Sequence, residues 1–191
     1  MSAATILRTA RLNKGLSQRA LAKECHVSQP AIARVESAVE QATLERLESW
    51  LRPLGSRITL VPFRTPTVYE VAEVIREDLN EGQLRHAFRA IIQLNDNFDA
   101  VDPATQVAIA ITPPVPTGDA RFDALIAGLV EYKLDRTHLP KPTWLSDIRF
   151  FLDTPWDVEE LPQLQAEARA LTPEQFVHHG VFIDPINFAS V

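Results

Sequence analysis

The stretch from Gly15 to Glu36, GLSQRALAKECHVSQPAIARVE, constrains the fold of this chain more than any other. Its spacing predicts two short helices separated by a tight turn. Ser17 and Ser28 each stand where a serine oxygen can accept a hydrogen bond from the free amides of a first helical turn. Apolar residues four apart in the first helix and three apart in the second fall on one face of each helix. The stretch therefore predicts a helical pair with a small shared core and one open face on the second helix.

This helical pair has the spacing of a DNA-binding helix-turn-helix. Residues 5–54 resemble the helix-turn-helix of the Xre/Cro/CI family of repressors. The residues that carry the resemblance are Gly15-Leu16-Ser17-Gln18, Leu21-Ala22, Val27-Ser28-Gln29, Ile32 and Arg34-Val35-Glu36. The family usually has glycine in the turn where this chain has His26, and histidine is among the residues found at positive φ. The alternative is an ordinary helical hairpin with no role in nucleic-acid binding.

The resemblance implies roles for particular residues of the second helix and its surroundings. Gln29 can form two hydrogen bonds to adenine and Arg34 two to guanine, so we expect these two side chains to read bases. Ala31 is expected to touch a thymine methyl group. Three further residues are expected to hold phosphates, which positions the helix without reading sequence: Gln18, Arg19 and Ser28. The resemblance also suggests an ion pair between Arg11 of a preceding helix and Glu36.

The distribution of charge fits contact with DNA at one end of the chain only. The net charge is −6, but residues 1–64 carry ten Lys and Arg against five Asp and Glu, a balance of +5. The remaining residues carry a balance of −11. A basic segment followed by an acidic one fits a protein that touches phosphate with its N-terminal part and something else with its larger part, although acidic residues also serve simply to solvate a surface.

Composition places the chain among globular proteins of the cytoplasm. Hydrophobic residues make up 46% and charged residues 23% of the 191 residues. No apolar run is long enough for a membrane span, and the N-terminus lacks the apolar core of a signal peptide. The one cysteine, Cys25, fits a core position of the first motif helix, so we interpret it as a small buried residue rather than a redox sensor.

The segments around the motif predict a helical domain that ends in a strand. Residues 3–14 are expected to form a first helix, and Thr43 to cap a further helix. The apolar stripe of that further helix is Leu44, Leu47, Trp50, Leu51 and Leu54. Ser56–Pro62 alternates and is rich in β-branched residues, which predicts a short strand. Its partner is either the same strand of a second copy, which we favour, or the segment Gly180–Ile183.

The remainder of the chain predicts a second, helical domain. Two prolines within residues 62–66 mark the boundary. Helices are expected from the cap at Thr67 to about residue 80, and over residues 83–97, 103–111, 119–134 and 161–171, with a further helix beginning at Thr172-Pro173-Glu174. From His138 onward, prolines and aromatic residues alternate, which fits either a wrap around the helices or a partner surface. The predicted fold is therefore mainly α: a lambda-repressor-like helix-turn-helix bundle with a short β-strand in residues 1–62, then an α-helical, partner-binding domain in residues 67–191.

Signals for catalysis are weak throughout. Six glycines leave no glycine-rich phosphate loop, and no Cys/His set has the spacing of a zinc site. His178 and His179 are adjacent, so on a helix they would point about 100° apart and are not expected to face one metal ion. The acidic residues of 153–160 are interpreted as a loop. We therefore expect no enzyme, no cofactor and no metal.

The C-terminal end carries a second resemblance. Residues 172–184, TPEQFVHHGVFID, resemble the C-terminal tail of bacterial Xre-type antitoxins, with two histidines where that tail has two basic residues. Together the resemblances imply a homodimeric repressor of double-stranded DNA that is also the antitoxin of a type II toxin–antitoxin system. Family association implies a toxin partner of nucleotidyltransferase-like type. The alternatives are a stand-alone transcriptional regulator whose C-terminal domain senses a small molecule or protein, and an enzyme with a DNA-binding head.

Overall fold

The computed structural model describes residues 2–61 and 64–188, and the chain divides into two compact units, residues 1–62 and 63–191. Pro62 and Phe63, which belong to the predicted boundary, lie outside the described residues. The fold is mainly α, as the sequence predicts. Among the described residues, no helix is both long and apolar enough to cross a membrane.

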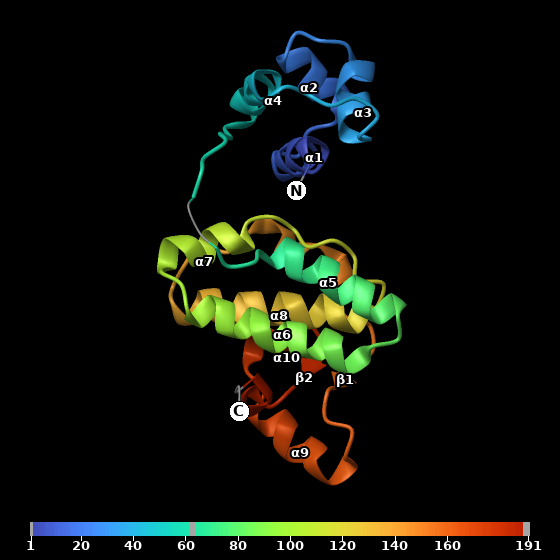
Figure 1. Cartoon of the computed structure of the whole chain (residues 1–191), viewed down its shortest axis with the longest axis vertical. Helices are drawn as coiled ribbons and strands as arrows, with labels where there is room; N and C mark the ends of the chain where they lie inside the picture. The colour runs from blue at the N-terminus through green and yellow to red at the C-terminus, as the bar shows by residue number, and fades with distance from the viewer. Residues whose placement is uncertain (1, 62–63, 189–191) are drawn as a thin grey trace. The chain divides into compact units, whose positions relative to one another are not determined.

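Over residues 2–61, the N-terminal unit is a bundle of four short α-helices (Figure 1). They are α1 (Ala3–Asn13), α2 (Gln18–Glu24), α3 (Gln29–Glu36) and α4 (Leu44–Leu51), and the 3-10 turn η1 (Arg52–Leu54) follows. Buried residues from all of these elements form one core: Leu7, Leu21, Ala22, Ala31, Ile32, Val35, Leu47, Trp50, Leu51 and Leu54. Leu44, expected in the apolar stripe of α4, is 63% exposed. The prediction was wrong for Leu44, which is the first residue of α4 and lies outside the core.

The two predicted serine caps differ in outcome. The Ser17 side chain accepts a hydrogen bond from the amide of Ala20 at 3.1 Å and caps α2. Ser28 precedes α3 but its side chain makes no cap hydrogen bond, so that prediction was wrong. Pro30 occupies the second position of α3 and has no N–H to offer. The amide of Ala31 instead donates to the backbone carbonyl of Ser28 at 3.0 Å.

Among residues 2–61, two non-glycine residues have left-handed backbone conformations. His26, in the turn between α2 and α3, has φ 54°, which confirms the conformation expected where the family has glycine. Ala38, just after α3, has φ 58° and is exposed. A Cβ atom is unfavourable in this region, because it crowds the following carbonyl oxygen.

Replacing Ala38 by glycine is expected to stabilise the N-terminal unit by about 0.5–1 kcal/mol, because the substitution removes the Cβ atom from a left-handed position. The measurement is the free energy of unfolding of the full chain in urea. The matched control is Ala33→Gly within α3, which is expected to destabilise by about 1 kcal/mol because glycine is a poor helix former. If Ala38→Gly and Ala33→Gly lowered the free energy of unfolding by similar amounts, the assigned backbone conformation of Ala38 would be contradicted.

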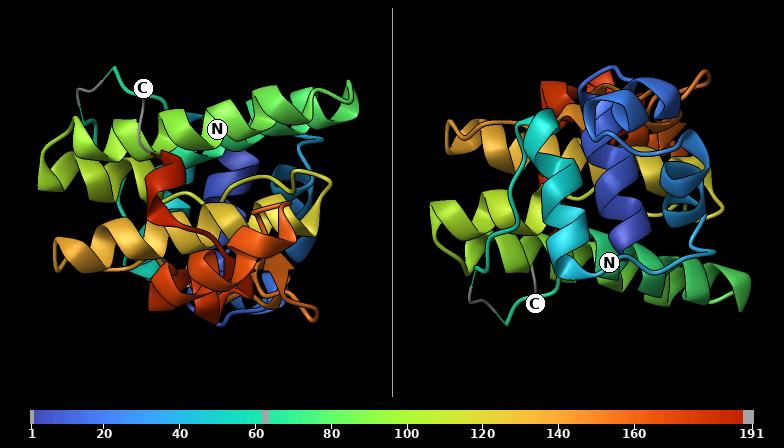
Figure 2. Two further views of the ribbon diagram at one scale, coloured as in Figure 1. Left: turned by 90° about the horizontal axis from the view of Figure 1, so that it is seen from below. Right: turned by 90° about the horizontal axis from the view of Figure 1, so that it is seen from above.

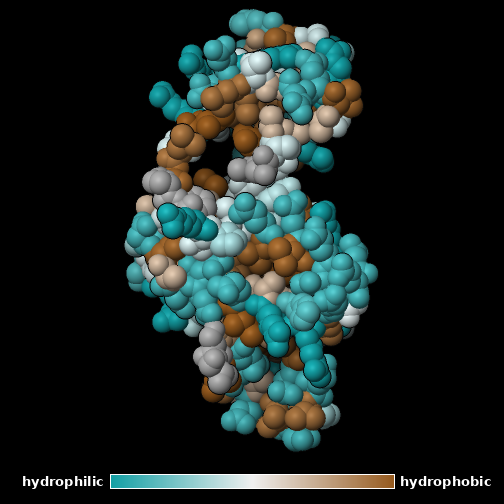
Figure 3. Space-filling model, in the orientation of Figure 1, coloured by the Kyte–Doolittle hydropathy of each residue, from teal (hydrophilic) through white to brown (hydrophobic). Residues whose placement is uncertain are grey.

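The segment after η1 does not pair with another segment of the chain among the described residues. Residues 56–61 form no strand there, and Pro62 lies outside the description. The alternative partner predicted for this segment, Gly180–Ile183, was wrong: β2 (Val181–Phe182) pairs in parallel with β1 (Trp156–Asp157). Hydrophobic surface lies along the segment that follows α4 (Figure 3), where Leu60 is 94% and Val61 is 40% exposed.

The C-terminal unit is built around one buried helix. Helices α5 (Val68–Asn80), α6 (Leu84–Asp99) and α7 (Pro103–Ala110) pack with α8 (Ala120–Arg136), which Figures 1 and 2 show among the other elements. Every residue of α8 from 122 to 130 is buried. The predicted cap of α5 is confirmed as a reciprocal capping box between Thr67 and Glu70. A sequence that is apolar around nearly the whole circumference of α8 requires neighbours on all sides.

The residues after α8 supply part of those neighbours. In chain order they are η2 (Thr143–Ser146), η3 (Ile148–Phe150), β1, α9 (Pro162–Leu171), α10 (Glu174–His178), β2 and η4 (Pro185–Phe188). Trp144, Phe150, Phe176 and Phe188 are buried in the core of this unit, so these aromatic side chains wrap the helices rather than form a partner surface. The N-cap of α10 is Pro173, not Thr172, whose hydroxyl donates to the carbonyl of Ala168.

A glycine sets the distance between α8 and α10. A Cβ atom at Gly128 would lie 2.7 Å from Cδ1 and 3.2 Å from Cα of Phe176. A side chain at this position would therefore push α10 away from the buried helix. This close contact with Phe176 explains why position 128, in the middle of α8, is a glycine, although glycine otherwise weakens a helix.

Candidate nucleic-acid interface

Helix α3 has a buried face and an open face, as its spacing predicts. Ile32 and Val35 are fully buried in the core of the N-terminal unit. The open positions are two adjacent pairs about one turn apart: Gln29, Pro30 and Arg34 are exposed and Ala33 is partly exposed. Together these four residues form the open face of α3, which is the surface available to a ligand.

Ala31 does not belong to the open face. It is 8% exposed and packs in the core, so little of its surface is available for the expected contact with a thymine methyl group. Ala33, which the sequence reasoning missed, follows Gln29 by four residues and has a partly exposed methyl group. The same helical spacing that selects Gln29 and Arg34 would have selected Ala33 over Ala31.

A chain of hydrogen bonds leads from the core to Gln29. Arg11 donates from Nε to Oε1 of Glu36 at 2.7 Å and from Nη2 to Oε2 at 2.8 Å, which confirms the predicted ion pair. Gln18 Nε2 donates to the same Oε2 atom at 2.9 Å, and Gln29 Nε2 donates to Gln18 Oε1 at 2.9 Å. The bidentate geometry fixes the carboxylate, which in turn orients both glutamine side chains.

The buried ion pair keeps Glu36 ionised. Burial by itself raises the pKa of Glu36, but the hydrogen bonds from Arg11 and Gln18 outweigh burial, and the pKa lies below its ordinary value. Arg11 also donates from Nη1 to the carbonyl of Leu16 at 2.6 Å, directly before α2. One arginine thus joins α1, the start of α2 and the end of α3.

Arg34 is held by a carboxylate that the sequence reasoning did not consider. Its Nε donates to Oε2 of Glu40 at 2.9 Å, although 53% of the Arg34 side chain stays exposed. Arg46 binds the other oxygen of Glu40, and the two arginines hold the pKa of Glu40 below its ordinary value. The Arg46 guanidinium in turn lies 4.5 Å from the ring centroid of Trp50. Arg34 is therefore oriented before any ligand binds, but its charge is partly neutralised.

The three expected phosphate contacts lie at the start of α2 and α3. Arg19 and Ser28 are exposed and Gln18 is partly exposed. Since the Ser28 hydroxyl makes no cap hydrogen bond, it can bind a ligand without breaking one. The structure therefore brings together Gln18 and Gln29 by a direct contact, while Arg34 lies five residues further along α3.

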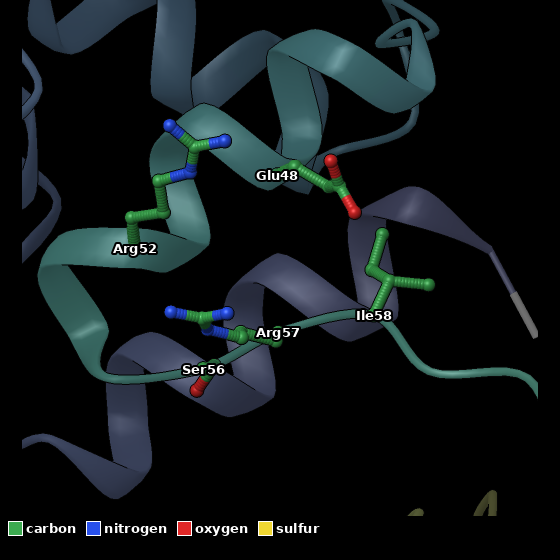
Figure 4. A pocket seen from close by; sticks show the side chains of 5 residues that line it. All are labelled: Glu48, Arg52, Ser56, Arg57 and Ile58. Atoms are coloured by element: carbon green, nitrogen blue, oxygen red, sulfur yellow. The ribbon is translucent and has the colours of Figure 1, made fainter.

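A shallow pocket in the N-terminal unit does not overlap these residues. It has a volume of about 310 Å³ and is lined by Glu48, Arg52, Ser56, Arg57 and Ile58 (Figure 4). Arg52 and Arg57 both extend along it, whereas Glu48 extends toward Ile58. None of the residues expected to bind DNA lines this pocket.

Cys25 packs against the core of the N-terminal unit and is partly buried. Its Sγ lies 3.8 Å from the carbonyl oxygen of Trp50, and burial raises the pKa of the thiol. A thiol with a raised pKa is a poor nucleophile at neutral pH. These features fit the interpretation of Cys25 as a packing residue.

In the C-terminal unit, the two adjacent histidines face the same carboxylate. His178 Nδ1 lies 3.3 Å and His179 Nε2 lies 3.0 Å from Oε2 of Glu131 on α8. The expectation that the two rings point to different places was wrong, because α10 ends at His178 and both rings turn toward α8. The interpretation of residues 153–160 as a loop was wrong for Asp157, which lies in β1 and is bound by Arg169, with 2.6 Å between Arg169 Nε and Asp157 Oδ1.

Comparison with known proteins identifies the N-terminal unit. Residues 7–61 match the family described as "Helix-turn-helix", and they form a helix-turn-helix domain of the Xre/lambda repressor-like type. An "Uncharacterized HTH-type transcriptional regulator" of Haemophilus influenzae is 41% identical over 56 residues, which cover 29% of this chain. The matched residues span 57% of that relative's length. No solved structure matches the chain.

Proposed function

Because residues 7–61 form a helix-turn-helix domain, we propose that this protein is a transcriptional repressor that binds double-stranded DNA sequence-specifically through α3. The observation that carries the proposal is the open face of α3, which presents Gln29, Ala33 and Arg34 from a helix anchored by the Arg11–Glu36 ion pair. A helix with polar side chains of fixed orientation is what base reading in the major groove requires.

Within this proposal, Gln29 reads adenine and Arg34 reads guanine, while Ala33 approaches a thymine methyl group. Phosphates are held by residues at the start of α2 and of α3, namely Gln18, Arg19 and Ser28. The excess of basic over acidic residues in residues 1–64 supports the same orientation. Affinity should therefore fall steeply as the salt concentration rises, because each phosphate contact releases counterions.

We further propose that the protein binds its operator as a homodimer. The supporting observation is the segment that follows η1, whose Leu60 and Val61 are exposed and which has no strand partner among the described residues. An antiparallel pair of these segments across a twofold axis would satisfy their open backbone groups and place Leu60 and Val61 on opposite faces of the two-stranded ribbon. The operator would then have two half-sites about one helical turn apart.

For the C-terminal unit, we propose the antitoxin role. Residues 172–176, TPEQF, belong to the antitoxin-like tail and place Phe176 in the core against Gly128, while Val177 and His178 remain exposed at the surface. The acidic balance of this unit adds charge by which a basic partner could be recognised. The proposed partner is a toxin protein, nucleotidyltransferase-like by family association.

A pocket in the C-terminal unit favours a second candidate function, a stand-alone regulator that senses a small molecule. The pocket has a volume of about 510 Å³, which lies within the range of small-molecule sites. It is lined by Arg64, Thr65, Pro66, Glu70, Val71, Val74, Ala90 and Gln93. Val71 and Val74 supply apolar surface, and Glu70 and Gln93 supply polar groups.

The experiment that separates the two functions is co-expression of the tagged protein with the product of the adjacent gene, followed by growth measurement and co-purification. The antitoxin proposal expects that the neighbour alone arrests growth, that co-expression restores it, and that the two proteins elute as one complex. If no complex forms and DNA affinity instead changes with a metabolite, the stand-alone regulator replaces the antitoxin.

A further inference from the structure

Three side chains of the C-terminal unit bring metal-ligating atoms together. They are Glu131 on α8, His178 at the end of α10, and His179 directly after it. The carboxylate oxygen and one nitrogen from each imidazole lie within 4.8 Å of one another. Glu131 and His179 are 48 positions apart in sequence, so the cluster exists only in the folded unit.

The backbone determines which nitrogen of His179 faces the cluster. His179 is fully buried, and its Nδ1 lies 2.8 Å from the carbonyl oxygen of Phe150 in η3. A carbonyl oxygen can only accept, so Nδ1 carries the hydrogen and Nε2 is directed at Glu131. This is the arrangement by which a backbone carbonyl commonly orients a metal-ligating histidine.

The spacing of the ligating atoms fits one small ion. Glu131 Oε2 lies 3.0 Å from His179 Nε2 and 3.3 Å from His178 Nδ1. Ligand atoms around a tetrahedral zinc ion lie about 3.4 Å apart, given bonds of about 2.1 Å. The remaining separation, between the ligating nitrogens of the two histidines, is within 4.8 Å. It can shorten by rotation of the His178 side chain, which is 61% exposed.

From this geometry we propose that Glu131, His178 and His179 form a binding site for one divalent transition-metal ion of the zinc class. Two imidazole nitrogens with one carboxylate oxygen suit Zn²⁺, Co²⁺ or Ni²⁺, whereas Mg²⁺ and Ca²⁺ prefer sets of oxygen ligands. Three protein ligands leave a fourth position for water, on the side where His178 is exposed. The site is separate from the DNA-binding surface and does not depend on the proposed function.

The lysine beside the cluster binds a different oxygen of Glu131 from the one that the two histidines face. Lys141 Nζ lies 3.0 Å from the other oxygen of Glu131, Oε1, and 2.8 Å from Oδ1 of Asp135, so it holds the carboxylate without covering Oε2. The ring of Phe151 packs against both imidazoles, with centroids 5.1 Å from His178 and 4.8 Å from His179. A bound ion would join α10 to α8 and so stabilise the C-terminal unit.

The test is titration of the full chain, after treatment with a chelator, with zinc chloride and with cobalt chloride. We expect one ion per chain, a visible absorption band of four-coordinate Co²⁺, and a rise in the Tm with zinc but not with magnesium. His178→Ala is the main variant, because an exposed side chain can be removed without disturbing the fold. We expect it to weaken zinc binding at least about tenfold, as loss of even an outer partner of a ligand does.

His86→Ala is the matched control, since it removes an exposed histidine of α6 that lies outside the cluster. It should leave zinc affinity unchanged, and Glu131→Gln should weaken binding as His178→Ala does. The proposal is overturned if no stoichiometric binding occurs, if magnesium competes as well as cobalt does, or if the two histidine variants lose affinity equally.

Discussion

Replacing Arg11 by alanine is expected to destabilise the N-terminal unit by about 3–5 kcal/mol, which is the cost of removing one partner from a buried ion pair. Arg11 is 7% exposed and Glu36 is 9% exposed. Without the guanidinium, a buried carboxylate loses two hydrogen bonds and its counter-charge, and the Leu16 carbonyl loses its donor. The measurement is the free energy of unfolding in urea, with Arg8→Ala, an exposed arginine of the same helix, as the control.

The same variant should change the pH dependence of stability in a defined direction. Because the folded-state pKa of Glu36 lies below its ordinary value, the ion pair contributes stability above the unfolded pKa of about 4.3 and loses it as the pH falls through the folded pKa. In Arg11→Ala this acid-induced loss should shrink. The double variant Arg11→Leu with Glu36→Leu should recover much of the stability at neutral pH, because it leaves no buried charge unpaired. A double variant as unstable as the single one would show that the ion pair is not the cause.

Replacing Arg34 by alanine is expected to weaken operator binding by about 1–3 kcal/mol and to relax the preference for guanine at one position. The reason is that a guanidinium on the open face of α3 can donate two hydrogen bonds to guanine. Fluorescence anisotropy at one salt concentration, with the operator and with single-base variants of it, measures both effects. Arg57→Ala is the matched control, since it removes the same charge from an exposed residue outside the open face. If both variants weaken binding to every sequence equally, Arg34 reads no base.

The pairing of Arg34 with Glu40 allows a sharper version of this measurement. Glu40→Gln removes the carboxylate that holds Arg34, so it should tighten binding and strengthen the guanine preference. Glu45→Gln removes an exposed carboxylate from the first turn of α4 and controls for the change in net charge. Equal effects of the two glutamine variants would mean that Glu40 acts only through its charge.

Residues that act on near neighbours in sequence were predictable. The Ser17 cap and the Thr67–Glu70 capping box depend on amides within three residues, and the open positions of α3 follow from a spacing of three or four. The Arg11–Glu36 ion pair was predicted as well, but only through the resemblance to a family. Ser28 shows the limit of local reasoning, because the sequence places a serine correctly while Pro30 removes an amide that it would bind.

Contacts that depend on how the chain turns and packs were not predictable in the same way. Glu40 lies beyond the end of α3, and nothing in its spacing indicates that it binds both Arg34 and Arg46. The parallel pairing of β1 with β2, and the burial of Ala31 rather than Ala33, also depend on how elements pack. Alanine suits either face of a helix, so its type carries no information about its position.

By itself, the sequence determined the helices, several of their caps, and which face of α3 is buried and which is open, because hydrophobic periodicity and capping act within about one helical turn. The tertiary structure alone decided that Glu40 pairs with Arg34 and that two adjacent histidines meet Glu131. These contacts depend on how whole elements pack. Glu131 and His179 are 48 positions apart, so their contact depends on every turn between them. The helix-turn-helix can therefore be predicted from a stretch of 22 residues, whereas the cluster of Glu131, His178 and His179 could be found only in the folded unit.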